Sequence, residues 1–328
     1  MIKSKILEEL TLTFQNKISN YKNIVDKELK SIYNKGPLNL TEPINHILSG
    51  GKRLRPLLCL LTASAFKGSK KDALIASVAI ELLHNFTLIH DDIMDNDDIR
   101  HGLSTIHNKW NNSIAILAGD ATLAIALIHL NRLTENKNLI IEHFNYALIQ
   151  VCEGQALDLA FQYNMDISEE DYISMIDKKT GYIIGLCSML GSIISKNDNS
   201  INIKLKKYGI LIGRAFQIQD DLLEITSNQN KMGKSLKSDF LLNKKTYLTI
   251  KANSINSNIV NKCIKTAKND FNLGFSKYKN FLVENGIVDE SIQKINGILA
   301  SARSILDGLD MNNKYLYEYI KLILNRDA

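Results

Sequence analysis

Hydrophobic side chains recur every three to four residues over most of the chain, which is the period of an α-helix that buries one face. Between Asp72 and Asp95 the recurring apolar positions are Leu74, Val78, Leu82, Leu83, Phe86 and Ile89. The same period predicts helices over Ile114–Leu133, Leu139–Phe161, Tyr172–Ile194 and Leu205–Ile225. Polar breaks separate the predicted helices at Lys67–Asp72, Asn164–Glu170, Lys196–Asn202 and Ser227–Asp239. No Asn-Gly pair is flanked by the alternation typical of strands, so the pattern predicts an all-α fold.

Proline usage agrees with long helices. The 328 residues include three prolines, Pro37, Pro43 and Pro56, so none follows position 56. A proline inside a helix costs about 3 kcal/mol, so this run permits uninterrupted helices, although central strands also avoid proline. Neither a compositional linker nor a sequence repeat divides the chain. We therefore expect one domain over residues 1–328.

Composition narrows the class of protein. With 45% hydrophobic and 23% charged residues the chain is not disordered, and its net charge of +5 is too small to indicate nucleic acid or a membrane surface. Four scattered cysteines, Cys59, Cys152, Cys187 and Cys263, exclude a disulfide framework and a Cys-based zinc site. The N-terminus does not resemble a signal peptide, and the apolar stretch Gly181–Ile194 is too short to span a bilayer. We expect a cytoplasmic protein with no nucleic-acid partner and no stable membrane insertion.

An acidic cluster ends the predicted helix around Asp72–Asp95. Asp91 and Asp95 are one helical turn apart, with Cβ atoms about 5–6 Å from each other, and Asp92 lies beside them. Thr87 and His84 continue the same face backward. Like charges at this spacing destabilise an isolated helix, so an ion or a basic group should compensate them.

A second cluster, Asp220, Asp221 and Glu224, repeats the same spacing inside another apolar helix. Gln217 and Arg214 lie on its face, one and two turns back. Two such helices facing each other would place carboxylates about 8–10 Å apart, a gap that suits hard divalent ions such as Mg²⁺. One acidic pentapeptide alone is more often a solvated helix face, but two copies on apolar helices favour a metal site.

Basic segments could bind an anionic substrate held by such ions. Lys52 and Arg55, in Gly50–Pro56, are suited to one phosphate group, because Arg binds phosphate bidentately and Lys supplies a compact charge. Further candidates are Arg100–Gly102, Lys179–Gly181, Gly233–Lys234 and Asn243–Thr246. Two open alternatives are that Lys179 is a helix-edge residue whose ammonium reaches water and that His84 is a satisfied core histidine.

Seven segments, in this order, resemble the trans-isoprenyl diphosphate synthases, or polyprenyl synthetases. They are Gly50–Pro56, His84–Gly102, Ile116–Ala121, Glu153–Asp158, Lys179–Gly181, Phe216–Glu224 and Gly233–Thr246. The resemblance implies the isoprenoid synthase fold, a bundle of long antiparallel helices around a deep central cavity, and a homodimer. It also implies a Mg²⁺-dependent condensation of isopentenyl diphosphate with an allylic diphosphate such as dimethylallyl, geranyl or farnesyl diphosphate.

By the same resemblance each motif residue acquires a role. Catalytic positions are Asp91, Asp92, Asp95, Lys179, Asp220 and Asp221. The ligands of a cluster of three Mg²⁺ ions correspond to Asp91, Asp95 and Asp220, with Asp239 or Glu224 nearby. The allylic diphosphate positions are Arg100, Lys179, Thr180, Gln217, Lys234 and Lys244, and the isopentenyl diphosphate positions are Lys52, Arg55, His84 and His101.

Phe86 and Thr87 correspond to the floor of the substrate cavity, where a bulky aromatic resembles short-chain synthases. We therefore expect a product of fifteen or twenty carbons, with twenty favoured. The chain departs from the family pattern at His101, Glu224 and Lys237, where Arg, Asp and Gly are usual. Two other hypotheses stay open, a non-catalytic regulatory subunit and a terpene cyclase. The matched acidic and basic residues argue against the first, and Gly50–Pro56 argues against the second.

Overall fold

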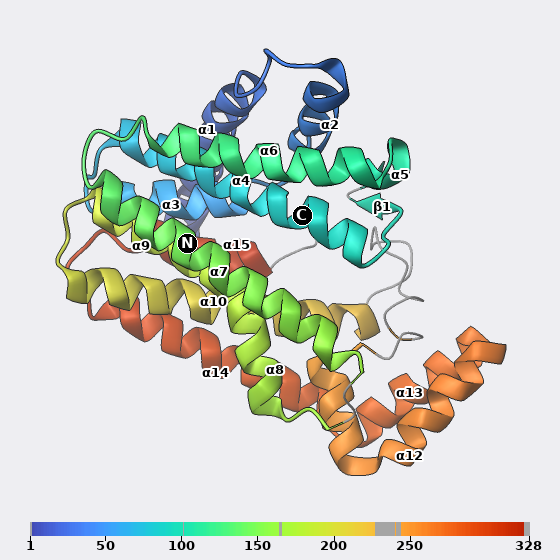
Figure 1. The fold of residues 1–328 in the computed structure, drawn as a ribbon. Helices are drawn as coiled ribbons and strands as arrows, with labels where there is room; N and C mark the ends of the chain where they lie inside the picture. The colour runs from blue at the N-terminus through green and yellow to red at the C-terminus, as the bar shows by residue number, and fades with distance from the viewer. Residues whose placement is uncertain (1, 101, 164–165, 227–239, 241–243, 325–328) are drawn as a thin grey trace. The chain divides into compact units, whose positions relative to one another are not determined.

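The computed structural model describes residues 2–100, 102–163, 166–226, 240 and 244–324, and it is almost entirely helical (Figure 1). Its helices are α1 (Ile2–Lys30), α2 (Leu38–Leu48), α3 (Leu54–Ala65), α4 (Lys70–Met94), α5 (Ile106–Lys109), α6 (Asn112–Leu130), α7 (Lys137–Phe161), α8 (Glu169–Ile176), α9 (Tyr182–Ile194), α10 (Asn199–Thr226), α12 (Tyr247–Asn269), α13 (Phe271–Glu284), α14 (Ile287–Asp307) and α15 (Lys314–Leu324). The predicted all-α fold and the five helices read from the hydrophobic period are confirmed.

A short hairpin interrupts the helices just after α4. Strands β1 (Ile99–Arg100) and β2 (Leu103–Ser104) pair antiparallel, with Ile99 opposite Ser104. Gly102 between them has a φ of +78°, a conformation that glycine adopts without strain. The hydrophobic pattern did not predict this hairpin, because two-residue strands are too short to show an alternation.

The chain divides into two compact units. The first comprises residues 1–148, 183–209 and 305–328, and the second comprises residues 149–182 and 210–304. Helices α7, α10 and α14 run unbroken from one unit into the other. The expectation of a single domain with a deep central cavity concerns both units together, and it stays a prediction.

In the first unit, α4 is the central core helix, packed between α3 and α6 (Figure 1). Its predicted core residues Leu82, Leu83 and Ile89 are buried. Ser69 caps its N-terminus through a hydrogen bond from the Asp72 backbone, which is why the helix starts inside the predicted polar break. Two described helices, α4 and α6, are long and apolar enough to cross a membrane, which the sequence interpretation overlooked; α4 is mostly buried in protein, as expected for a core helix.

In the second unit, α8 begins with a capping box formed by Ser168 and Asp171. It continues directly into a π-helical turn, Asp177–Gly181, before α9 starts. The predicted helix Tyr172–Ile194 is therefore one helical rod with a widened turn in its middle. Such π turns are rare and frequently mark functional positions.

Candidate active site

The first acidic cluster lies at the C-terminal end of α4, in the first unit. Asp91 and Asp95 are half-buried, whereas Asp92 is only 2% exposed. Asp92 forms an ion pair with the Nε of Arg100, whose guanidinium also donates to Asp97 at 3.3 Å. Arg100 therefore supplies the compensating charge that the stacked carboxylates require, and it does so from the β1 strand.

The predicted isopentenyl diphosphate residues are partly assembled in the same unit. Arg55 Nη1 donates to His84 Nε2 at 2.9 Å, so this histidine nitrogen accepts a hydrogen bond. The Nε of Arg55 is buried and has no hydrogen-bond partner among the described residues. A buried donor without a partner is costly, and a phosphate oxygen would satisfy it. Lys52 is exposed three residues earlier, as a substrate-facing lysine requires.

Arg53, between those two residues, has a structural role that the sequence did not reveal. It adopts a left-handed conformation with φ +54° and is 5% exposed. Its guanidinium donates to Asp26 and Glu81, each at 2.8 Å. This buried ion network fixes the backbone that carries Lys52 and Arg55, while its sequence signal, one basic residue in a basic run, resembles a surface position.

The second acidic cluster lies on α10 in the second unit and repeats the burial pattern of the first. Asp220 and Glu224 are half-buried, and Asp221 is 6% exposed. The Tyr172 hydroxyl donates to Asp221 Oδ2 at 2.5 Å, and the Tyr247 backbone N–H donates to the same oxygen at 2.8 Å. In both clusters, therefore, the second aspartate is buried and bonded, and the other two acids are more exposed.

Tyr172 is a functional residue that sequence reasoning missed. Burial and then the Asp221 charge raise the pKa of Tyr172 well above its usual value, so the hydroxyl keeps its proton and donates it. Gln217 Nε2 reaches the other Asp221 oxygen at 3.3 Å, and Thr180 donates to Gln217 Oε1 at 3.1 Å. The predicted diphosphate residues Thr180 and Gln217 thus belong to one hydrogen-bonded chain with Asp221.

Lys179 lies in the π turn, where two motifs that are distant in sequence meet. Its Nζ is 2.5 Å from Asp158 Oδ2, and its backbone passes so close to Gly154 that a Cβ there would lie 2.3 Å from Lys179 N. Gly154 and Asp158 both belong to the segment Glu153–Asp158 that carried the family resemblance. The Lys179 ammonium is held by this carboxylate and is 24% exposed, so the hypothesis that Lys179 is a helix-edge residue stays open beside the substrate-binding one.

Arg214 also has a defined partner. It binds Asp177 of the π turn bidentately, with Nε–Oδ1 at 2.9 Å and Nη2–Oδ2 at 2.5 Å. The hydrogen bond to Asp177 raises the pKa of Arg214. This pair ties α10 to the turn that carries Lys179.

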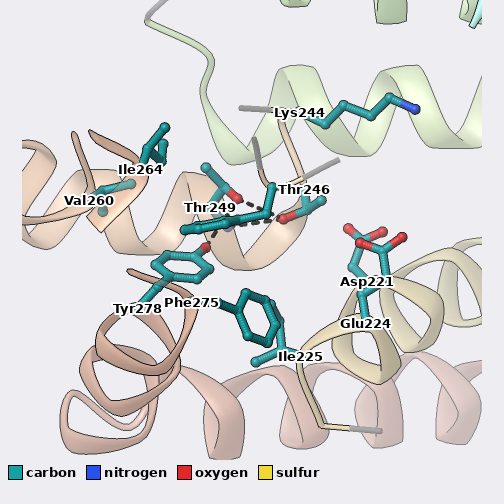
Figure 2. Close-up of a pocket in the computed structure, with 11 residues that line it drawn as sticks. Asp221, Glu224, Ile225, Lys244, Thr246, Thr249, Val260, Ile264, Phe275 and Tyr278 are labelled. Carbon is teal, nitrogen blue, oxygen red and sulfur yellow. Dashed lines mark hydrogen bonds between the residues drawn. The ribbon is translucent and has the colours of Figure 1, made fainter. Parts of the chain in front are cut away.

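Figure 2 shows a pocket beside the second cluster, with an empty volume of about 430 Å³ that opens to solvent. The carboxylates of Asp221 and Glu224 lie next to each other at one end, and Lys244 extends nearby. Apolar side chains, including Val260 and Ile264, line the other end. The pocket places the predicted Lys244 and Glu224 on one rim.

Four sequence-predicted positions, His101, Lys234, Lys237 and Asp239, lie outside the described residues. Thr87 and Phe86 are half-buried on α4; the Thr87 hydroxyl donates to the His84 carbonyl at 2.8 Å. One acidic cluster belongs to the first unit and the other to the second. That the two clusters face each other therefore stays a prediction.

The carboxylates of the two acidic clusters suit a metal ion that is also bound by phosphate oxygens of a substrate. Among the residues that the structure describes, no group of three or more His, Cys, Asp or Glu side chains is gathered to hold a metal ion on its own. Mg²⁺ usually takes one or two carboxylates and completes its octahedron with water and phosphate oxygens. The pairs Asp91–Asp95 and Asp220–Glu224, each one turn apart, fit that requirement.

Comparison with known proteins places this geometry in a family. The family model described as Polyprenyl synthetase matches residues 37–273. The chain belongs to the polyprenyl synthetase family. It is 39% identical over 250 residues to a geranylgeranyl diphosphate synthase of Saccharolobus solfataricus, covering 74% of each chain. It is 35% identical to a geranylgeranyl pyrophosphate synthase of Geoglobus acetivorans, covering 89% of this chain and 92% of the relative.

Solved structures agree with this polyprenyl synthetase fold. The crystal structure of a geranylgeranyl pyrophosphate synthetase from Pyrococcus horikoshii has a TM-score of 0.87 and 32% identity, covering 98% of this chain and 99% of that one. The similarity extends over nearly the whole chain, so the isoprenoid synthase fold expected from the motifs is confirmed.

The Tyr172 hydrogen bond yields a prediction for this polyprenyl synthetase. Tyr172→Phe removes a donor to a buried carboxylate, so we expect the free energy of unfolding in urea to fall by about 1.5–3 kcal/mol, the range for bonds to charged groups. Tyr278→Phe is the matched control, because that buried hydroxyl bonds the neutral Thr249 at 3.1 Å and should cost only about 0.5–1.5 kcal/mol. Equal losses in the two variants would show that Asp221 does not depend on Tyr172.

Proposed function

We propose that the protein is a Mg²⁺-dependent prenyltransferase that condenses isopentenyl diphosphate with dimethylallyl, geranyl or farnesyl diphosphate. The expected product is an all-trans prenyl diphosphate of fifteen or twenty carbons, with geranylgeranyl diphosphate favoured. The observation that carries the proposal is the repeated burial pattern of the two acidic clusters. Each cluster fixes its second aspartate through hydrogen bonds, and its other two acids lie one turn apart and are half-buried.

The acidic residues would hold the metal. Asp91 and Asp95 in one cluster and Asp220 and Glu224 in the other are the proposed ligands, with Asp239 as a further candidate outside the described residues. Bound Mg²⁺ would neutralise the charge that develops on the departing diphosphate. Asp92 and Asp221 act differently, because both are committed to partners that orient their helices.

Basic residues would complete the allylic diphosphate site. Asp158 holds the Lys179 ammonium at 2.5 Å, and Asp92 holds the Arg100 guanidinium. Both cations are therefore pre-positioned and need little reorganisation when negative charge develops on the leaving diphosphate. Thr180 and Gln217 form the hydrogen-bonded chain to Asp221, and Lys244 lies on the same rim as Glu224. Lys234 is the remaining proposed member and lies outside the described residues.

The second substrate would bind at Arg55, Lys52 and His84, with His101 as a further candidate. The unpartnered Nε of Arg55 is a ready donor for a phosphate oxygen. Holding isopentenyl diphosphate beside the allylic carbon makes the bond-forming step effectively intramolecular. No nucleophilic side chain is required. The bond between the allylic carbon and the diphosphate breaks, and the double bond of isopentenyl diphosphate attacks the allylic cation that remains. The new cation then loses a proton, which the released diphosphate would accept.

The other hypotheses receive less support. A terpene cyclase has no second diphosphate to hold, so it would not need the buried Nε of Arg55 or the ion network around Arg53. A non-catalytic subunit would be expected to lose matched charges, yet each cluster and its partners are intact. The relatives reported above are named as synthases, which agrees with a catalytic role.

We propose further that the protein is a cytoplasmic homodimer with the solvent-facing side of α6 as its interface. Ile116, Leu117 and Ile128 are 47%, 56% and 68% exposed on this helix. Large apolar side chains gathered on one exposed helix face are typical of an interface.

If α6 forms the interface, a single negative charge on its exposed side should prevent dimer formation. Ile128→Glu should convert the dimer to a monomer in light scattering after size-exclusion chromatography, because a carboxylate would be desolvated at the contact. Ile203→Glu, on the 55% exposed Ile203 of α10, is the control and should leave the mass unchanged. A dimer that survives Ile128→Glu would contradict this assignment of the interface.

The activity itself is tested with purified protein, Mg²⁺, labelled isopentenyl diphosphate and each of the three allylic diphosphates. Elongation supports the proposal, cyclic hydrocarbon from the allylic substrate alone supports a cyclase, and no turnover without a partner protein supports a regulatory subunit. Asp91→Ala and Asp220→Ala should each lower turnover by at least about 100-fold, since both remove charge stabilisation from the leaving diphosphate. Asp310→Ala, at an exposed aspartate, is the control; near-normal rates in either cluster variant would remove the metal assignment.

A further inference from the structure

His90 of α4 occupies a gap in α6 that a glycine leaves open. A Cβ built on Gly119 would lie 2.3 Å from His90 Nε2 and 2.6 Å from His90 Cδ2, closer than any real contact. The imidazole therefore lies directly against the α6 backbone, where any other residue would displace it. Helices α4 and α6 pack along their length in the first unit, so this contact is part of an extensive interface (Figure 1).

The same ring contacts Phe86, one turn earlier on α4. The centroids of the Phe86 and His90 rings are 4.7 Å apart with an interplanar angle of 65°, an edge-to-face arrangement. Such a contact is favourable beyond the area it buries. His90 thus contacts both Gly119 of α6 and Phe86 of its own helix, and the position of each ring limits that of the other.

The imidazole of His90 also contacts two polar groups of α6, a backbone carbonyl and a carboxylate. His90 Nε2 is 3.4 Å from the Ile116 carbonyl oxygen and 3.8 Å from Asp120 Oδ1. Both are long contacts, so they orient the ring without committing it to a strong bond. The close approach to Gly119 adds a third restraint, because a side chain at that position would displace the imidazole.

We infer that His90, seated against Gly119, sets the position of Phe86 and is a specificity-determining residue for product length. The inference rests on the proposed function and on the family resemblance, by which Phe86 corresponds to the floor that stops the growing chain. Thr87 is the other proposed floor residue, but its hydroxyl is turned back to the His84 carbonyl and contacts its own helix. While His90 contacts the Phe86 ring, that ring stays in place when the product would grow by another isoprene unit. Without the contact, the Phe86 ring can rotate away and make room for a longer product.

Three variants test the inference through the distribution of product lengths, a readout that does not depend on rate. His90→Ala removes the support, so the share of products longer than those of the unmodified protein should rise by about tenfold, the scale of discrimination for small changes in an apolar pocket. Gly119→Ala displaces the imidazole that contacts Phe86, so the distribution of product lengths should change. Phe86→Ala removes the floor and should lengthen the products by itself.

The decisive comparison repeats both changes in the Phe86→Ala background. If His90 acts through Phe86, neither His90→Ala nor Gly119→Ala should alter product length further there, as a double-mutant cycle requires for coupled residues. Gly297→Ala is the matched glycine control, because a Cβ at that helical position would meet nothing within 4 Å. It should keep both the rate and the product lengths of the unmodified protein.

The outcomes separate the inference from the proposed function. An unmodified protein that elongates no allylic diphosphate contradicts the proposed function, and the inference falls with it. An active protein whose His90→Ala and Gly119→Ala variants keep the original product lengths contradicts the role of His90 alone. Effects of the same size in the Phe86→Ala background would show that His90 acts without Phe86, and would also overturn the inference.

Discussion

The structure depends on one buried aspartate in each acidic cluster. Asp92 and Asp221 are almost fully removed from water, and a carboxylate in that position is tolerated only when hydrogen bonds replace its hydration. Arg100 supplies them to Asp92, and Tyr172 with the Tyr247 backbone supplies them to Asp221. Since rotation of either helix end would break these bonds, the remaining acids of each cluster are held in a fixed direction.

The basic groups follow the same logic with opposite charge. Lys179 of the π turn is held by Asp158 of α7, and Arg214 is held by Asp177 of the turn. Arg53 is held by two carboxylates, Asp26 and Glu81. The Arg53–Glu81 pair is buried, and a pair of that kind contributes little net stability but strongly penalises any arrangement that separates the partners. The Lys179 and Arg214 pairs are partly buried and restrain their side chains in the same sense. They therefore hold these side chains in fixed positions, which the proposed diphosphate site requires.

Helical periodicity and repeated acid spacing were sufficient to predict the all-α fold, its five central helices and both clusters, because these signals are local. The roles of Tyr172, Arg53 and Gly154 were not predictable, since each depends on a partner brought close only by folding. In the sequence, Tyr172 fits the helical recurrence of apolar core positions. Its hydroxyl has a role only in the folded chain, where it donates a hydrogen bond to Asp221. The β1–β2 hairpin was missed because its strands are shorter than any detectable period.

The most direct test of this account is a crystal structure with Mg²⁺ and an unreactive allylic diphosphate analogue. The account predicts Mg²⁺ ions bound by Asp91, Asp95 and Asp220 together with oxygens of the analogue, while Asp92 and Asp221 keep their bonds to Arg100 and Tyr172. A structure in which Asp92 or Asp221 leaves its partner to bind the metal, or in which neither cluster contacts an ion, would contradict it.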